Sequence, residues 1–147
     1  MIGYICRMSR IIAIDYGTKR IGLAVTDPHQ IIATGLDTVH AKDVFKFLKQ
    51  YISKEEVSCF VVGEPKQADA TDSEIKIHID GFIKKLKKDF PEIPVERYDE
   101  RFTSKMASNA LLMSGLKKKD RQNKALVDMT SAIIILQSYM ESKRIKN

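Results

Sequence analysis

Runs of apolar residues, many of them β-branched, predict strands in the first part of the chain. Residues 11–14 and 21–26 are two such runs, and a glycine lies in the break between them, which indicates a hairpin. The pair Asp27-Pro28 is a turn signal, and a looser alternation over residues 31–39 predicts a third strand. The chain therefore opens with a predicted antiparallel meander of three strands.

Helical and strand-like spacings alternate after the meander. Apolar residues recur at helical intervals over residues 41–52 and 73–90, which predicts two amphipathic helices. The β-branched run at residues 57–62 predicts a strand, and residues 95–102, which follow a turn bracketed by two prolines, are also strand-like. A loop is predicted over residues 63–72, because the proline there cannot donate a hydrogen bond to a strand ladder.

The last part of the chain is predicted to be helical. One helix, capped by Thr103 or Ser104, runs toward Leu112, and a long final helix spans residues 124–142. Successive apolar residues at 132–136 predict that the final helix is buried on most sides. Parallel strands need helical crossovers and a hairpin does not, so the layout predicts an α/β fold with a mixed sheet flanked by helices.

The composition fits a single globular domain. The chain has 147 residues, 44% hydrophobic and 30% charged, and no apolar run approaches the roughly 18 residues of a membrane span. We interpret residues 9–143 as one domain, residues 144–147 as a tail and residues 1–8 as an upstream extension, with Met8 as a candidate start. Neither cysteine has metal-ligand spacing, and Cys59 lies in an apolar run typical of a buried free thiol. We expect a cytoplasmic protein.

The net charge of +6 favours a polyanionic partner, although a basic solvated surface would give the same charge. The adjacent cations Lys19 and Arg20 lie at the edge where the first strand ends and suit phosphate oxygens. A basic segment between two predicted helices also suits phosphate contacts, or forms a solvated loop. The predicted nucleic-acid-binding residues are Lys19, Arg20, Arg101, Lys117, Lys118, Lys119 and Arg121.

Asp15 places a carboxylate at the end of the first strand, in an otherwise apolar run. Sheets of α/β proteins commonly place their sites at the carboxyl ends of strands, and a carboxylate buried there needs a partner or a metal. Gly17 follows closely and permits close backbone approach. The alternative is that Asp15 is an ordinary turn residue.

The pair Asp99 and Glu100 ends the last predicted strand. Strand alternation sends these two side chains to opposite faces, so only one of them can join Asp15. Parity with the neighbouring aromatic residues favours neither acid by itself. The alternative for this pair is a surface ion pair with Arg101.

Two further acids could complete a cluster. Asp128 lies in the early turns of the apolar final helix, where it either faces the sheet as a ligand or stabilises the helix dipole. Glu64 follows the strand at residues 57–62 and could stand beside Asp15 if the two strands are neighbours, or it is a solvated loop acid. Converging carboxylates repel one another, and Mg²⁺ or Mn²⁺ would relieve this. Such clusters suit two-metal phosphodiester hydrolysis.

Four ordered motifs resemble those of the YqgF/RuvX family of Holliday-junction-resolvase-like proteins, also described as pre-16S rRNA nucleases. They are IIAIDYGTKRIGLAVTD, FVVGEP, YDERFTS and KALVDMTSAIIILQSY, and the resemblance covers about residues 9–143. It implies an RNase H-like superfold with a five-stranded mixed sheet and metal-dependent nuclease chemistry. It also implies cytoplasmic processing of the 5′ end of pre-16S rRNA, whereas a junction-resolvase function rests mostly on fold analogy.

The resemblance also implies a site. It puts the catalytic and metal-binding acids at Asp15, Glu100 and Asp128, with Glu100 favoured over Asp99, and Mg²⁺ or Mn²⁺ as cofactor. Where many relatives have Gly-Leu-Pro-Leu-Asn, residues 63–67 are Gly-Glu-Pro-Lys-Gln, so an acid is added that either binds metal or alters the substrate groove. The implied partner is structured RNA such as pre-rRNA, or branched DNA, and the protein is expected to be a monomer or homodimer.

Two other functions compete with a nuclease. The Asp-x-Gly-Thr sequence at residues 15–18 also resembles the first phosphate loop of actin-like ATPases and sugar kinases. Those enzymes need two domains and a second nucleotide loop, for which this chain has no room. The second rival is a non-catalytic nucleic-acid-binding module, such as a ribosome-assembly factor, in which the acids are structural.

Overall fold

The computed structural model describes residues 9–64, 70–99 and 124–146. Within these ranges the elements follow one another in the order β1 (Arg10–Asp15), β2 (Arg20–Thr26), β3 (Ala33–His40), α1 (Val44–Lys54), β4 (Val57–Glu64), α2 (Ala70–Asp89), β5 (Val95–Asp99) and α5 (Lys124–Lys146). No helix within these ranges is both long and apolar enough to cross a membrane.

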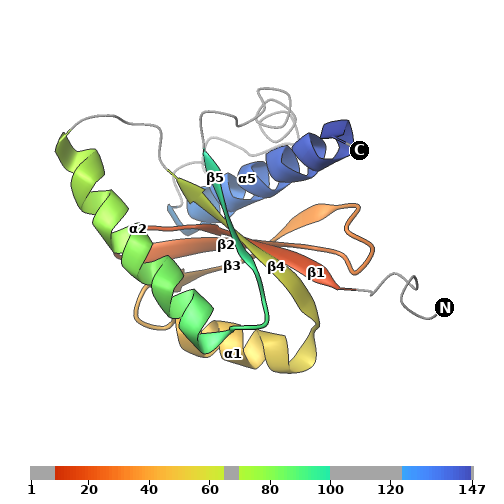
Figure 1. Ribbon diagram of the computed structural model, residues 1–147, viewed down its shortest axis with the longest axis horizontal. Helices are drawn as coiled ribbons and strands as arrows, with labels where there is room; N and C mark the ends of the chain where they lie inside the picture. The colour runs from red at the N-terminus through yellow and green to blue at the C-terminus, as the bar shows by residue number, and fades with distance from the viewer. Residues whose placement is uncertain (1–8, 65–69, 100–123, 147) are drawn as a thin grey trace.

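The strands form one five-stranded sheet in the order β3-β2-β1-β4-β5 (Figure 1). β1 pairs antiparallel with β2, and β2 with β3, whereas the pairs β1–β4 and β4–β5 are parallel. The parallel pairs depend on the crossovers that α1 and α2 provide. The predicted meander and the mixed sheet are both confirmed.

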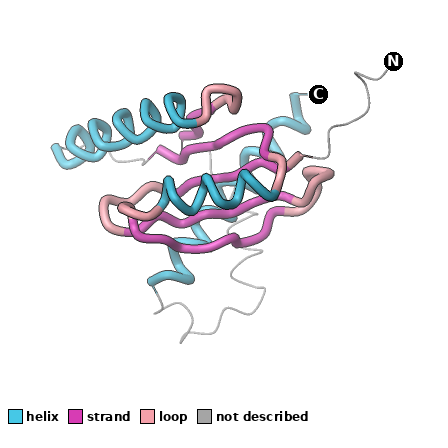
Figure 2. Tube along the Cα trace, turned by 90° about the horizontal axis from the view of Figure 1, so that it is seen from below, coloured by secondary structure: helices cyan, strands magenta, loops and turns pink. Residues whose placement is uncertain are grey.

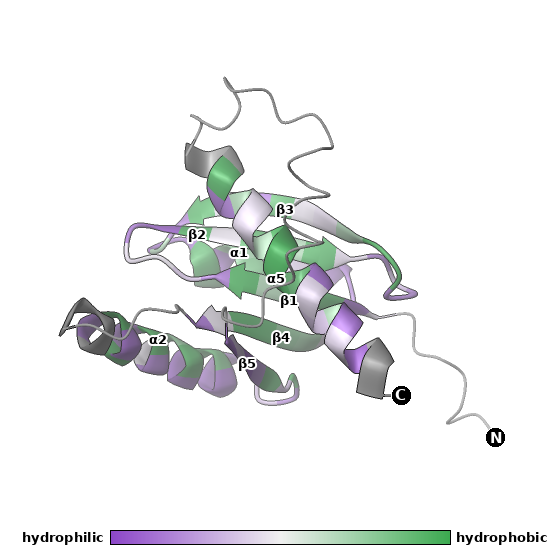
Figure 3. Ribbon diagram, turned by 90° about the horizontal axis from the view of Figure 1, so that it is seen from above, coloured by the Kyte–Doolittle hydropathy of each residue, from purple (hydrophilic) through white to green (hydrophobic). Residues whose placement is uncertain are grey.

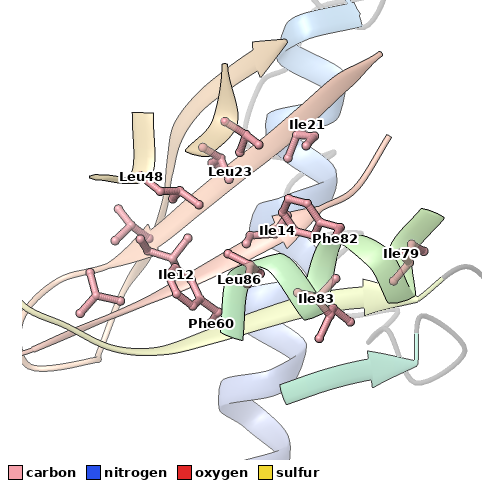
Figure 4. Packing of buried hydrophobic residues seen from close by; sticks show 14 residues of the cluster. Ile12, Ile14, Ile21, Leu23, Leu48, Phe60, Ile79, Phe82, Ile83 and Leu86 are labelled. Carbon is pink, nitrogen blue, oxygen red and sulfur yellow. The ribbon is translucent and has the colours of Figure 1, made fainter. Parts of the chain in front are cut away.

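Helices cover both faces of the sheet. α1 and α2 lie on one face, here called the α1/α2 face, and α5 crosses the other, the α5 face (Figures 2 and 3). Side chains alternate along β1 between the two faces. Ile12 and Ile14 pack among the side chains of α1 and α2 (Figure 4). Ile11 and Ala13 pack with α5. A strand buried on both faces is apolar at successive positions, as the sequence of β1 is.

The third strand begins later than predicted, at Ala33. The carboxylate of Asp27 accepts hydrogen bonds from the backbone N–H groups of Ile31 and Ile32, both at 2.7 Å, and holds these residues in the turn. Their side chains are consequently among the exposed large apolar groups, each 60% exposed. The prediction counted them as strand because they begin the loose alternation over residues 31–39.

Both ends of the predicted loop at residues 63–72 belong to regular elements in the structure. β4 continues through Gly63 and Glu64 because these residues pair with Tyr98 and Asp99 of β5. α2 begins at Ala70 rather than at residue 73. α1, by contrast, begins later than predicted, because residues 41–43 form a turn before it.

The final helix is longer than predicted. α5 continues to Lys146, into the segment interpreted as a tail. Of its described side chains, Ala132 and Leu136 are fully buried against the sheet, Ile133 is half-buried and Val127 is 41% exposed. No side chain at residues 132–136 is exposed, so the predicted burial holds for this stretch and not for Val127. The predicted strand residues 100–102, the helix capped near residue 103 and the basic segment at 117–121 lie outside the described residues.

Candidate functional site

Asp15 ends β1 between two glycines. Its partners across the sheet are Gly22 of β2 and Gly63 of β4. Cross-strand partners project to the same face, and Asp15 shares the parity of Ile11 and Ala13, which pack with α5. Because glycine carries no side chain, neither cross-strand neighbour of Asp15 places a side chain next to it on the α5 face.

The start of α5 lies directly against this part of the sheet. A Cβ added to Gly22 would overlap the backbone carbonyl group of Asp128, so the helix backbone passes over the glycine. Next to it, a Cβ on Gly35 would lie 2.6 Å from Cγ of Met129. These two glycines set the depth at which α5 packs. They bring Asp128 to the strand position that is paired with Asp15.

Arg20 and Asp128 form an ion pair at the same edge. Arg20 Nε donates a hydrogen bond to Asp128 Oδ2 at 2.8 Å, across 108 residues of sequence. The side chain of Arg20 is 43% exposed and that of Asp128 24% exposed, so solvent reaches both. A predicted phosphate-binding residue is thus bonded to a predicted metal ligand.

Glu64 lies on the opposite face of the sheet. It accepts a hydrogen bond from Arg97 at 2.7 Å, and the same guanidinium contacts Asp80 of α2, also at 2.7 Å. The hydrogen bond to Glu64, followed by the one to Asp80, raises the pKa of the Arg97 side chain. β4 does neighbour β1, as the hypothesis about Glu64 requires, but the Glu64 side chain projects to the α1/α2 face, away from Asp15.

Alternation along β5 separates Asp99 from the residue before it. Tyr98 faces α5, where its ring meets that of Tyr139 with centroids 6.2 Å apart. Glu96 faces the same way and accepts a hydrogen bond from the Tyr139 hydroxyl. Asp99, the next position after Tyr98, is the register partner of Glu64 and shares its face. Glu100 lies outside the described residues, and its sequence parity is that of Glu96 and Tyr98.

The described residues supply part of an oxygen-donor site for a cation. Asp15 and Asp128 provide carboxylates on one face at one edge of the sheet, and Mg²⁺ and Mn²⁺ prefer such ligands. Among the described residues no three His, Cys, Asp or Glu side chains group closely enough to hold a metal. The donor chemistry fits a divalent cation, and the third predicted ligand, Glu100, is not among these residues.

The predicted cations fall into two groups. Lys19 and Arg20 are exposed beside the site, and the Lys19 carbonyl accepts a hydrogen bond from the Ala41 N–H at 2.9 Å, which fixes the backbone there. The space next to Gly17 is taken by the carbonyl of Arg20, so this glycine serves the hairpin turn. The other predicted cations, Arg101, Lys117, Lys118, Lys119 and Arg121, lie outside the described residues.

Sequence reasoning missed Gly22 and Arg97. Gly22 interrupts a β-branched strand, and an isolated glycine inside a strand indicates close backbone approach, so a signal was present. Arg97 gave no signal, because its bonds to Glu64 and Asp80 depend on how β5 pairs with β4 and where α2 packs.

A second polar cluster lies at the other end of the strands on the α5 face. A cavity of about 680 Å³ opens there, lined in part by Cys59, Glu96, Tyr139 and Lys143. Cys59 Sγ donates to Glu96 at 3.5 Å, and Lys143 Nζ lies 3.6 Å from the same carboxylate. Burial, followed by the nearby Glu96 charge, raises the pKa of the Cys59 thiol to about 12. The free, buried thiol expected at Cys59 is confirmed.

The sequence matches a family model over most of its length. Residues 9–142 match the model described as "RuvX: Holliday junction resolvase". A protein of Bacteroides thetaiotaomicron is 56% identical over 137 residues, covering 93% of this chain and 99% of its own. One of Phocaeicola vulgatus is 58% identical over the same number of residues and with the same coverage. Both carry the name "Putative pre-16S rRNA nuclease".

Solved structures of RuvC share the fold. The structure of T. thermophilus RuvC in complex with Holliday junction substrate superposes with a TM-score of 0.62 at 12% identity, covering 93% of this chain and 96% of that one. A second Thermus thermophilus RuvC structure gives a TM-score of 0.54 at 14% identity. At this identity the likeness bears on the architecture alone, and it confirms the predicted RNase H-like fold.

Proposed function

This chain belongs to the RuvX family, and on that premise we propose that it is a metal-dependent endonuclease that processes the 5′ end of pre-16S rRNA in the cytoplasm. Support for RNA as the substrate comes from the names of relatives that match nearly the whole chain at 56% and 58% identity. The likeness to RuvC, at 12% identity, concerns the fold, so branched DNA enters only as an alternative outcome of the test.

The proposed site consists of Asp15, Asp128 and Glu100. The observation that carries it is the contact of the Asp128 backbone with Gly22, the residue paired with Asp15, because it joins the first strand and the last helix at one point. Tyr98 supports Glu100 as the third acid, since it faces α5 and Glu100 has the same parity. Asp99 and Glu64 are left out, because both share the other face.

The three acids would hold Mg²⁺ or Mn²⁺, which supplies an activated water and charge stabilisation at the phosphate when bound. Asp15 contributes its carboxylate from a rigid, fully paired strand end, so its position is fixed before substrate arrives. Lys19 and Arg20 contribute positive charge beside the acids, where they orient the phosphate backbone of the substrate. The hydrolysis needs no serine, cysteine or histidine nucleophile.

The test is cleavage of a labelled RNA that spans the 5′ end of pre-16S rRNA, compared with a four-way DNA junction, in Mg²⁺, Mn²⁺ and EDTA. We expect metal-dependent cleavage of the RNA, lost in Asp15→Asn and Asp128→Asn. The matched control is Asp43→Asn, an exposed acid that makes no side-chain cap bond on α1. Binding of RNA without Asp15-dependent cleavage of either substrate would falsify the nuclease and favour a non-catalytic assembly factor.

A further inference from the structure

We propose that Arg20 and Asp128 form an exchangeable pair: Asp128 gives up Arg20 when it takes a divalent cation, and the released guanidinium then binds a substrate phosphate. The inference rests on the proposed function, because it requires Asp128 to be a cation ligand. It assigns to Arg20 a role beyond general phosphate attraction, namely that of a residue that couples occupation of the metal site to binding of nucleic acid.

The geometry allows the two side chains to separate while both backbones stay in place. Arg20 is the first residue of β2, and its register partner on β3 is His40. The neighbouring Lys19 carbonyl is fixed by a hydrogen bond from the Ala41 N–H. Asp128 is held by packing of its backbone on Gly22. Exchange of partners therefore needs only side-chain rotation.

The exposure of the pair makes the exchange feasible. Arg20 Nε and Asp128 Oδ2 are 2.8 Å apart, but the side chains are 43% and 24% exposed. An ion pair with this much solvent contact contributes little net stability, because water and salt screen the charges. A pair buried from solvent would resist exchange, since separating it would leave an uncompensated charge. Asp128 can therefore change partner at little cost.

The exchange also fits the chemistry of both groups. A carboxylate is a preferred ligand for Mg²⁺ and Mn²⁺, and a guanidinium is suited to bidentate phosphate contacts. While Asp128 holds the Nε side of Arg20, that edge of the guanidinium does not bind phosphate. By thermodynamic reciprocity, a cation that frees Arg20 strengthens RNA binding, and bound RNA strengthens cation binding by the same factor.

The first test follows the guanidinium directly by NMR. The Arg20 Nε–Hε resonance is expected to shift during a Mg²⁺ titration, in step with the backbone amide of Gly22, which reports the site. Arg10 is the matched control, because its Nε donates to Glu55 at 3.2 Å at the opposite end of β1. Its resonance is expected to stay in place.

The second test removes the positive charge of Arg20. Arg20→Gln is expected to bind Mn²⁺ about two- to fivefold more tightly in calorimetry without nucleic acid, because Asp128 no longer has a competing partner. With Mn²⁺ at saturation, the same variant loses about one phosphate contact, so the slope of log affinity for an RNA stem-loop against log[KCl] falls by about 0.7–0.9. Without Mn²⁺ the slope is expected to match the wild type. Arg10→Gln carries the same charge change and should alter neither quantity.

The outcomes separate this inference from the proposed function. If Mg²⁺ shifts the Gly22 amide and leaves Arg20 Nε unchanged, the exchange is wrong and the metal site stands. The exchange is equally wrong if Arg20→Gln loses the same salt slope with and without Mn²⁺. If Mg²⁺ shifts no resonance around Asp15 and Gly22, the metal site itself is wrong, and the exchange fails with it.

Discussion

Gly22 of β2 lies directly against the backbone of Asp128. Gly22 is paired with Asp15 at the end of β1, so the last helix contacts the sheet there through a residue without a side chain. Any side chain at Gly22 would occupy the position of the Asp128 carbonyl group. The distance between the two acids of the proposed site is therefore set by a residue without functional groups.

Replacing Gly22 by alanine is expected to push α5 away from the sheet. The strain of overpacking typically costs about 1–3 kcal/mol of unfolding free energy, and displacement of Asp128 should also reduce cleavage strongly. Gly81 is the matched control, because nothing lies within 4 Å of a Cβ added there on helix α2. Gly81→Ala should stabilise the protein by about 0.5–1 kcal/mol, as helix propensity predicts. Urea unfolding of both variants measures the difference, and equal effects would contradict the packing argument.

Replacing Glu100 and Asp99 by their amides, one at a time, tests which of the two acids lies on the face of Asp15. Glu100→Gln is expected to abolish metal-dependent cleavage, and Asp99→Asn to retain most of it, because Asp99 shares the α1/α2 face with Glu64. Initial cleavage rates at fixed Mg²⁺ provide the measurement. A reversed order of the two variants would show that Asp99 is the ligand.

Glu64→Gln is expected to keep the cleavage rate close to wild type, because this carboxylate is bonded to Arg97 and Asp80 shares the same guanidinium. The pair is exposed enough that its loss should change stability by less than about 1 kcal/mol. Manganese titrations of the variant should give the wild-type affinity. A marked loss of affinity would instead make Glu64 a metal ligand.

The turn after β2 is expected to weaken in acid. Backbone hydrogen bonds, the one from Ile32 foremost and then those from Ile31 and His29, lower the pKa of Asp27. Because its pKa is lower in the folded state, Asp27 adds stability at pH values above the ordinary pKa of an aspartate. This stability is lost as the pH falls through the pKa of Asp27 in the folded protein. The Tm difference between wild type and Asp27→Asn should therefore be largest near neutral pH and shrink toward pH 3. A constant difference would contradict this assignment.

The thiol of Cys59 is expected to react slowly in the folded protein. Its pKa of about 12 leaves far less thiolate at pH 8 than in the unfolded chain, where an ordinary thiol has a pKa near 8.5 and alkylates more than about a hundredfold faster. Mass spectrometry of iodoacetamide labelling in a Cys6→Ser background measures both rates. Rapid labelling without denaturant would mean that the thiol is not shielded by burial and by Glu96.

The strands of the sheet could be predicted because β-branched residues cluster in them, and β1 in particular is apolar on both faces. The loose alternation over residues 31–39 misled at Ile31 and Ile32, whose backbone N–H groups bond to the Asp27 carboxylate and not to a neighbouring strand. The sequence could also place Asp15 and Asp128 at the ends of their elements. It could not pair Arg20 with Asp128, because that contact arises only when α5 docks on Gly22.

The order of synthesis gives the docking of α5 a further consequence. All five strands precede α5 in the chain, and Asp128 follows its partner Arg20 by 108 residues. Translation proceeds from the N-terminus, so Asp15 and its flanking glycines can be in place before Asp128 exists. On the proposed function, a chain that ends before Asp128 lacks one acid of its active site. Catalytic competence would therefore come only with the docking of the last helix.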